Sequence, residues 1–160
     1  MAIRARRIEA DYLKVGEDFE LLGAGFTGID EKLNSQVTEK KYVNDASSSQ
    51  SVTGYKWQAD FTGDQIVSNN AIEYIVGIGK ELKTGGDAET EYIKVDLDKE
   101  ASTEGSFYAR KFKVAIQVNE FPNNDGDLGL SGTFLGLGDP IIGSFNTKAK
   151  AFTEGFTAKA

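Results

Sequence analysis

The stretch Phe107–Phe121, FYARKFKVAIQVNEF, decides the fold class of this chain. Its even-numbered positions are mostly apolar and include Phe112 and Ile116, whereas its odd-numbered positions include Lys111 and Lys113. Alternation with a period of two residues is typical of a β-strand whose two faces differ in polarity. We therefore predict a long strand in an antiparallel sheet that has core on one face and water on the other.

Two further stretches alternate in the same way. In Val52–Phe61, the face that we expect in the core is formed by Thr53, Tyr55, Trp57, Ala59 and Phe61. In Glu91–Asp98, an apolar face opposes a polar face made of Tyr92, Lys94, Asp96 and Asp98. Weaker patterns predict strands at Gln36–Val43, Asp127–Leu137 and Pro140–Phe145.

One helix interrupts this series of strands. Ser68 is a candidate N-cap, and Ile72, Ile75 and Val76 follow at helical spacing. Gly85 can end the helix. Two glycines inside the segment weaken an isolated helix, but they suit a helix that packs flat on a sheet.

Strands followed by one helix and then further strands predict a mainly β fold. We expect an antiparallel β-sandwich or barrel with one flanking α-helix and extended terminal arms. The sandwich domain spans residues 17–146, the N-terminal arm residues 1–16 and the C-terminal arm residues 147–160.

The chain of 160 residues contains no histidine and no cysteine. Disulfides, zinc ribbons, Ser-His-Asp triads and histidine general bases are therefore excluded. Residues 23–28 match GxGxxG, but a dinucleotide site needs repeated βαβ units, so a glycine-rich loop or bulged strand is favoured. The turn at residues 123–127 lacks coordinating residues at the ends of a calcium loop. We expect no enzyme, no cofactor and no metal.

The net charge of −7 is unevenly distributed. Residues 1–7 carry three arginines and no acid, and residues 146–160 carry three lysines against one glutamate. Residues 8–145 therefore hold 12 basic and 24 acidic residues, a net charge of −12. An acidic body argues against wrapping nucleic acid, and basic ends can bind another copy of the chain. Two solvated tails would give the same pattern.

The order of motifs carries more information than any single site. It includes KYVND (Lys41–Asp45), SVTGY (Ser51–Tyr55), the TGGDAETEYI turn, the ARKFKVAI strand and the ending from GDP to SFNT. Over Phe19–Phe152 this order resembles the major tail tube protein of long-tailed, non-contractile bacteriophages.

The resemblance implies a β-sandwich with a flanking helix. It also implies hexameric rings whose inner sheets join into one barrel, stacked into a tube that conducts the genome. The implied partners are the chain itself and the tape measure, tail terminator and distal tail proteins, with DNA passing without specific binding. The implied location is the virion tail, assembled in the host bacterial cytoplasm, with no membrane partner.

Three sets of residues are the expected sites of this function. The inter-subunit arm contacts are Arg4, Arg6, Arg7, Lys148 and Lys150. The inter-ring loop is formed by Asn44, Asp45, Ser47, Ser48 and Ser49. The candidate acidic lumen or surface face comprises Glu39, Asp60, Asp96 and Asp98, although a register error of one residue would exchange the faces of a strand.

Two other functions stay open from the sequence. A β-sandwich that binds or decorates a capsid or cell surface explains the β pattern equally well, but it gives the basic ends no role. A nucleotide-dependent enzyme would use the glycines of residues 23–28.

Overall fold

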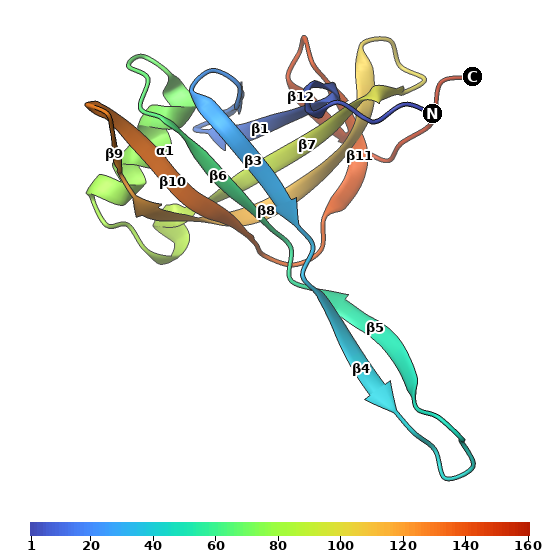
Figure 1. The fold of residues 1–160 in the computed structure, drawn as a ribbon. Coiled ribbons are helices and arrows are strands. Elements are labelled where there is room, and N and C mark those ends of the chain that lie inside the picture. Colours follow the sequence, from blue (N-terminus) through green and yellow to red (C-terminus); the bar gives the residue numbers. More distant parts are fainter.

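A computed structural model describes residues 1–160 and confirms a mainly antiparallel β fold with a single α-helix (Figure 1). The strands are β1 (Glu9–Val15), β2 (Asp18–Leu21), β3 (Phe26–Lys32), β4 (Ser35–Lys40), β5 (Ser49–Tyr55), β6 (Gln58–Asp64), β7 (Glu89–Glu100), β8 (Ser106–Glu120), β9 (Asn123–Asn124), β10 (Asp127–Gly136), β11 (Ile141–Asn146) and β12 (Ala151–Glu154). The helix α1 spans Asn70–Lys80, and short 3₁₀ turns occupy Arg6–Ile8 and Gly85–Ala88.

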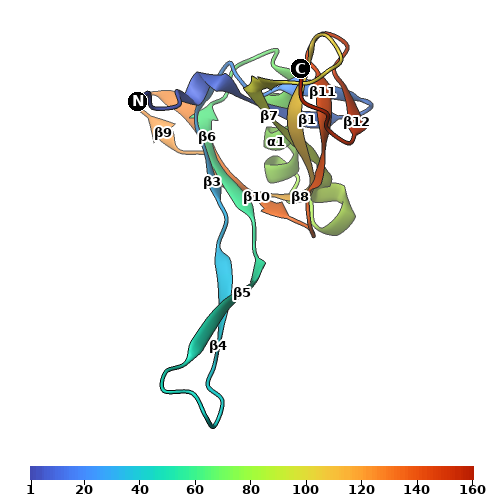
Figure 2. The ribbon, with the colours of Figure 1, turned by 90° about the vertical axis from the view of Figure 1, so that its right-hand side faces the viewer.

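The main sheet has the order β2-β1-β7-β8-β10-β6-β3, and all its neighbours are antiparallel. It curls into a half-barrel around α1 (Figure 2). Strand β11 pairs with the start of β8 and carries β12 beside it. Strands β4 and β5 pair only with each other and form a hairpin that leaves the body.

The predicted strand at residues 107–121 is confirmed as β8, at the centre of the sheet. It contributes to two cores, one on each face. Phe112, Val114 and Ile116 belong to the main core inside the curl, where α1 covers them. On the other face, Ala109 joins a smaller core that is roofed by the β11–β12 hairpin through Phe145.

Strand β7 also serves both cores, which corrects one expectation. Ile93 and Val95 lie in the smaller core, as an apolar face should. The opposite face was expected to be wet, but Tyr92, Lys94 and Asp96 are buried inside the curl. The alternation was correct, yet both faces of this strand are covered.

The helix begins one residue later and ends three residues earlier than predicted. Asn69 rather than Ser68 is the N-cap, because its side chain accepts a hydrogen bond from the Ile72 amide at 3.1 Å. Leu82 adopts a left-handed φ of 53°, and the Lys83 amide donates to the Ile78 carbonyl at 3.0 Å. This Schellman-type geometry ends the helix before Gly85 is reached.

Gly79 allows α1 to lie directly on the sheet. A Cβ atom built there would meet the Val118 side chain at 2.9 Å and the Phe121 ring at 2.7 Å. The expectation that a glycine-containing helix packs flat on a sheet is therefore confirmed at this position.

The predicted terminal arms are shorter than expected. Glu9–Val15 was assigned to the N-terminal arm of residues 1–16, but it forms β1 inside the main sheet, with Leu13 fully buried. The C-terminal arm of residues 147–160 contains β12, and Ala158 forms a bridge with Ala101. Only residues 1–8 precede the sheet. The sequence analysis missed β1 because its alternation is too short to recognise among its charged residues.

The single strand predicted at residues 52–61 is wrong, since the strand is interrupted at Lys56 and Trp57. Strand β5 belongs to the protruding hairpin, and β6 belongs to the body. Tyr55 is therefore exposed, whereas Trp57 and Phe61, expected on the same face, are buried.

The glycines of residues 23–28 lead into β3 and not into a helix. A register shift between Phe26 and Gly28 marks a bulge in the pairing of β3 with β6. The bulged strand is therefore confirmed, and the structural context of a dinucleotide site is missing.

We predict that Trp57→Ala lowers the free energy of unfolding by about 3–5 kcal/mol. The indole stacks on Phe112 with ring centroids 3.8 Å apart, and its Nε1 donates to Glu31 at 2.6 Å. Urea denaturation followed by far-UV circular dichroism measures the change. The exposed hairpin aromatic provides the control, since Tyr55→Ala should cost under about 0.5 kcal/mol. Equal losses for the two variants would contradict this account of the core.

Candidate assembly surfaces

The β4–β5 hairpin is the most unusual surface of the molecule, because it projects from the body with no covering element (Figures 1 and 2). Every residue of β4 is exposed. Large apolar side chains nevertheless occur along it, namely Leu33, Val37, Tyr42, Val43, Val52 and Tyr55. An isolated two-stranded hairpin is only marginally stable in water, and contiguous exposed apolar groups mark an interaction surface.

Hydrogen bonds at both ends shape the hairpin. At its base, the Lys56 amide donates to the Asn34 carbonyl at 3.2 Å, and Asn34 Nδ2 donates to the Lys56 carbonyl at 3.0 Å. Near its tip, the amide of Tyr42 donates to the carboxylate of Asp45 at 2.9 Å. The Ser48 hydroxyl donates to Glu39.

The structure places the predicted inter-ring loop at this tip. Asn44, Asp45, Ser47 and Ser48 lie between the two strands, and Ser49 begins β5. Glu39 lies at the end of β4, beside the same loop, and so does not belong to a face of the main sheet.

The four candidate acidic residues are not brought together. Asp60 lies on the face of β6 turned away from the main core, where it pairs with Lys32 at 2.6 Å and accepts from Thr133 Oγ1 at 2.8 Å. Asp98 is paired with Arg4 at 3.0 Å. Asp96 is only 7% exposed, so its assignment to an open acidic face is wrong for the free subunit.

Asp96 is buried because β7 curls inward and because the N-terminal segment around Arg4 covers this part of β7. Its nearest cations are Arg4 and Lys99, each 3.9 Å from a carboxylate oxygen. Burial and the nearby Glu9 raise the pKa of Asp96 above its ordinary value. The charged form of this side chain is therefore disfavoured in the folded subunit.

The face of β3, β6 and β10 that points away from the main core is polar, with Asp30 exposed, Asp60 half-buried and Thr133 buried. Cross-strand pairing places Asp30 opposite Asp60, Asp60 opposite Thr133, and Thr133 opposite Gln117 of β8. This row of carboxylate, hydroxyl and amide groups crosses four strands. The prediction of strands with one wet face is confirmed for this half of the sheet.

A buried charge cluster joins β1 to β7 inside the curl, and the sequence did not predict it. Lys94 Nζ lies 2.9 Å from Asp11 Oδ1, and both residues are at most 3% exposed. Arg6 Nη2 reaches the other carboxylate oxygen at 2.5 Å, and the Tyr92 hydroxyl donates to the same carboxylate. Burial alone would raise the pKa of Asp11, but Lys94, Arg6 and Tyr92 outweigh it and lower that pKa.

A second ion pair crosses the curl between β3 and β8. Arg110 donates two hydrogen bonds, of 2.6 and 3.2 Å, to the Glu31 carboxylate, and Trp57 Nε1 donates to the same carboxylate. Burial opposes ionisation of Glu31, but the bonds from Arg110 and Trp57 prevail and lower its pKa. The free edge strand β3 is thereby fixed to the centre of the sheet.

The basic residues expected in the arms divide into two groups. Arg4 and Arg6 are paired with acids of their own subunit. Arg7, Lys148 and Lys150 are exposed and have no ion pair. The second group therefore keeps its charge available for another molecule.

No group of three or more acidic side chains is arranged to hold a metal ion, and no helix has the length and hydropathy of a membrane span. No protein-family model and no curated protein sequence matches the chain. Solved structures do match over nearly its whole length. One is a chain from the tail of an empty gene transfer agent particle determined with C6 symmetry, at 11% identity and a TM-score of 0.62. The alignment covers 94% of this chain and 99% of that one.

This chain has the fold of a gene transfer agent tail protein. A chain from the virion of a native gene transfer agent particle matches equally, at 11% identity, a TM-score of 0.61 and the same two coverages. The resemblance to phage tail tube proteins is therefore confirmed for the fold. At this identity the match does not transfer individual residues, so the surfaces above rest on their own geometry.

We predict that Asp11→Asn destabilises the subunit by about 3–5 kcal/mol at pH 7, because it removes the buried counter-charge of Lys94 and leaves only the partly exposed Glu9, 3.5 Å away. The double variant Asp11→Asn with Lys94→Met should recover most of the loss. The wild-type carboxylate has a lowered pKa, so its contribution is complete above its unfolded value near 4 and is lost as the pH falls through its folded value. The cost of Asp11→Asn should therefore shrink in urea titrations below about pH 4. A cost that is independent of both Lys94 and pH would contradict this account.

Proposed function

We propose that this chain is a structural virion protein, which assembles as stacked hexameric rings into the tube of a phage-like tail. The observation that carries the proposal is the β4–β5 hairpin, whose apolar side chains have no cover in the subunit. A second copy supplies that cover without any other partner. The match of fold to a tail protein in a particle with C6 symmetry supports the same choice.

The position of the hairpin favours an open-ended assembly. It leaves one end of the body and is far from the rest of its own surface, so a second copy can receive it on a different surface, at the other end of the body (Figure 1). Contacts of this heterologous kind produce rings or continuing stacks, in contrast to closed two-fold dimers.

The open edges of the half-barrel favour lateral assembly. Strands β2 and β3 end the main sheet and leave one backbone edge of each without a strand partner. Exposed edges risk uncontrolled pairing, and joining sheets between subunits of a ring removes them. The ring then acquires a continuous barrel, in which each subunit contributes its polar outer face.

The row from Asp30 to Gln117 suits a wall past which DNA slides. The exposed carboxylate of Asp30 repels phosphate, and the exposed amide of Gln117 remains hydrated, whereas Asp60 is paired with Lys32. Screening limits the repulsion to about 8–10 Å at physiological salt, so the wall discourages sticking and does not close the channel. The body charge of −12 for residues 8–145 has the sign that this role requires.

The remaining partners follow from this role. The chain contacts itself above all, and the tape measure, tail terminator and distal tail proteins meet the inside and the two ends of the tube. DNA passes through without specific binding, for delivery into the host. Assembly takes place in the bacterial cytoplasm, and the finished protein lies in the virion. The role is structural and requires no catalysis.

We predict that replacing residues 35–55 with an Asn-Gly turn abolishes tube formation and leaves the body folded. Asn34 and Lys56 already exchange backbone and side-chain hydrogen bonds, so a short turn can join them. Negative-stain microscopy of concentrated protein should show tubes for the wild type and none for the variant, with circular dichroism as the test of folding. A wild type that stays monomeric at every concentration would sink the proposed function and favour a binding or decoration module.

We predict that Arg7→Glu weakens the tube without changing the subunit, whereas Arg6→Ala mainly destabilises the subunit. Arg7 is exposed and unpaired, but Arg6 neutralises the buried Asp11. Thermal melts of dilute protein report on the subunit, and the salt concentration that dissolves the tubes reports on the assembly. The reverse pattern would show that Arg7 acts within its own subunit.

A further inference from the structure

The N-terminal end of α1 lies at the end of the body opposite the hairpin (Figures 1 and 2). A groove runs beside this helix. Strand β6 starts at Gln58, next to the hairpin base, and runs away from it to Asp64. The chain then passes through residues 65–69 to the helix. The groove is formed between this connection and α1, and its lining residues are Gln65, Ile66, Val67, Ile72, Glu73, Val76, Gly77 and Lys80.

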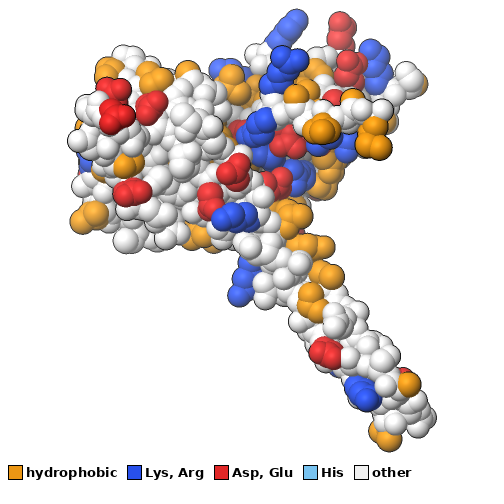
Figure 3. Space-filling model, viewed as in Figure 1, with side chains coloured by type: hydrophobic (Ala, Val, Ile, Leu, Met, Phe, Trp, Pro, Cys, Tyr) orange, Lys and Arg blue, Asp and Glu red, His pale blue; other side chains and the backbone are white.

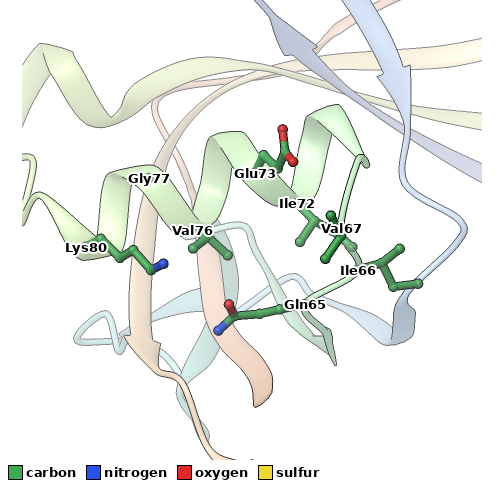
Figure 4. Close-up of a pocket in the computed structure, with 8 residues that line it drawn as sticks. All are labelled: Gln65, Ile66, Val67, Ile72, Glu73, Val76, Gly77 and Lys80. Atoms are coloured by element: carbon green, nitrogen blue, oxygen red, sulfur yellow. The ribbon is translucent and has the colours of Figure 1, made fainter. Parts of the chain in front are cut away.

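The mouth of the groove is apolar and uncovered. Val67 is 85% exposed and Ile66 is 41% exposed. Figure 4 shows Val67 beside Ile72, with Val76 further along the helix and Lys80 at the far end. The neighbouring connection is firm, because the Gln65 amide donates to the Leu128 carbonyl at 3.0 Å, and Leu128 is itself exposed.

The charges around the groove are complementary to those of the hairpin tip. The groove end carries Asp64, Asp125 and Asp127, all exposed and without an ion pair, and Glu73 lies in its wall. Acidic side chains gather on the same end of the body in the space-filling view (Figure 3).

The tip carries Lys40 and Lys41 in front of Tyr42 and Val43. Neither lysine has an ion pair, and Val43 is fully exposed. Lys40 and Lys41 at an apolar tip therefore match the carboxylates near an apolar groove. Glu39 and Asp45 of the tip face the opposite charge in Lys80, which also lines the groove.

We propose that the groove of one copy receives the hairpin tip of a second copy, with Val43 against the exposed Val67 and Ile66. This assignment rests on the proposed function and adds the receiving surface to it. Because tip and groove lie at opposite ends of one chain, each contact leaves a free tip and a free groove, and the stack can grow without limit.

Disulfide trapping tests the pairing directly, since the chain has no cysteine of its own. The variant Val43→Cys with Val67→Cys, oxidised under conditions of tube growth, should give a ladder of dimers, trimers and longer species on a non-reducing gel. Each single variant should stop at dimers, because one thiol per chain cannot extend a series. Val43→Cys with Ile142→Cys is the matched control, since Ile142 is exposed on β11 away from the groove.

The outcomes separate the inference from the proposed function. Tubes without a ladder for the Val43–Val67 pair, or an equal ladder for the control, would overturn the receiving surface and leave the tube role intact. A wild type that forms neither rings nor tubes would remove both.

Charged variants provide a second test that does not depend on disulfide geometry. Val43→Asp and Val67→Asp should each reduce tube yield at least about tenfold, because a carboxylate would be buried without a partner in the contact. Val43→Lys combined with Val67→Asp should regain part of the yield. Both side chains are exposed in the free subunit, so its melting temperature should not change. Unchanged yields, or the absence of any rescue, would count against the pairing.

Discussion

The position of the edge strand β3 depends on the ion pair between Glu31 and Arg110. A half-barrel has two free edges, and the hydrogen bonds of the sheet hold β3 from one side only. The two-pronged contact of Arg110, with the indole Nε1 of Trp57 on the same carboxylate, ties the strand across the curl to β8. Such a pair is weak evidence for net stability, but its fixed geometry sets where the strand lies.

The Glu31–Arg110 ion pair also sets the direction in which the β4–β5 hairpin leaves the body. Strands β4 and β5 continue β3 and β6 beyond the body, and they meet no other element. The orientation of β4 and β5 is therefore fixed at the base of the hairpin. The hydrogen bonds between Asn34 and Lys56 and the position of β3, which Glu31 holds, both contribute. A small change of angle at the base of the hairpin becomes a large displacement at its tip. The directional hydrogen bonds between Arg110 and Glu31 therefore suit this position better than an apolar contact of equal area.

The sequence predicted the fold better than it predicted the environment of individual polar residues. Alternation located β8 to within one residue, because apolar side chains at every second position share one face of a strand but would scatter around a helix. The same rule misplaced Lys94 and Asp96, since a polar face looks alike whether it meets water or a buried counter-charge. The partners of Lys94 come from β1, more than 80 residues away in the sequence, and a local pattern of residues does not show which distant strand will pair with β7.

The two strands of the hairpin were predicted, but its protrusion from the body was missed for a related reason. From Thr53 to Phe61 the alternation continues without interruption, although the chain leaves the protruding sheet and enters the body at Lys56. Tyr55 would be a core residue by its pattern, yet it is 64% exposed. The motif Lys41–Asp45 did point to the tip, because the resemblance to tail tube proteins assigned a contact role to this loop.

A two-stranded ribbon with six large exposed apolar side chains gains little stability from its own fold, so these side chains are left for the association proposed above. The buried charges of the body have the opposite character, since Asp11, Lys94, Glu31 and Arg110 are satisfied within one chain. The subunit can therefore fold before it assembles, with its polar pairs complete and its hairpin incomplete. In the proposed tube, growth would therefore depend on protein concentration, whereas the fold of each subunit would not.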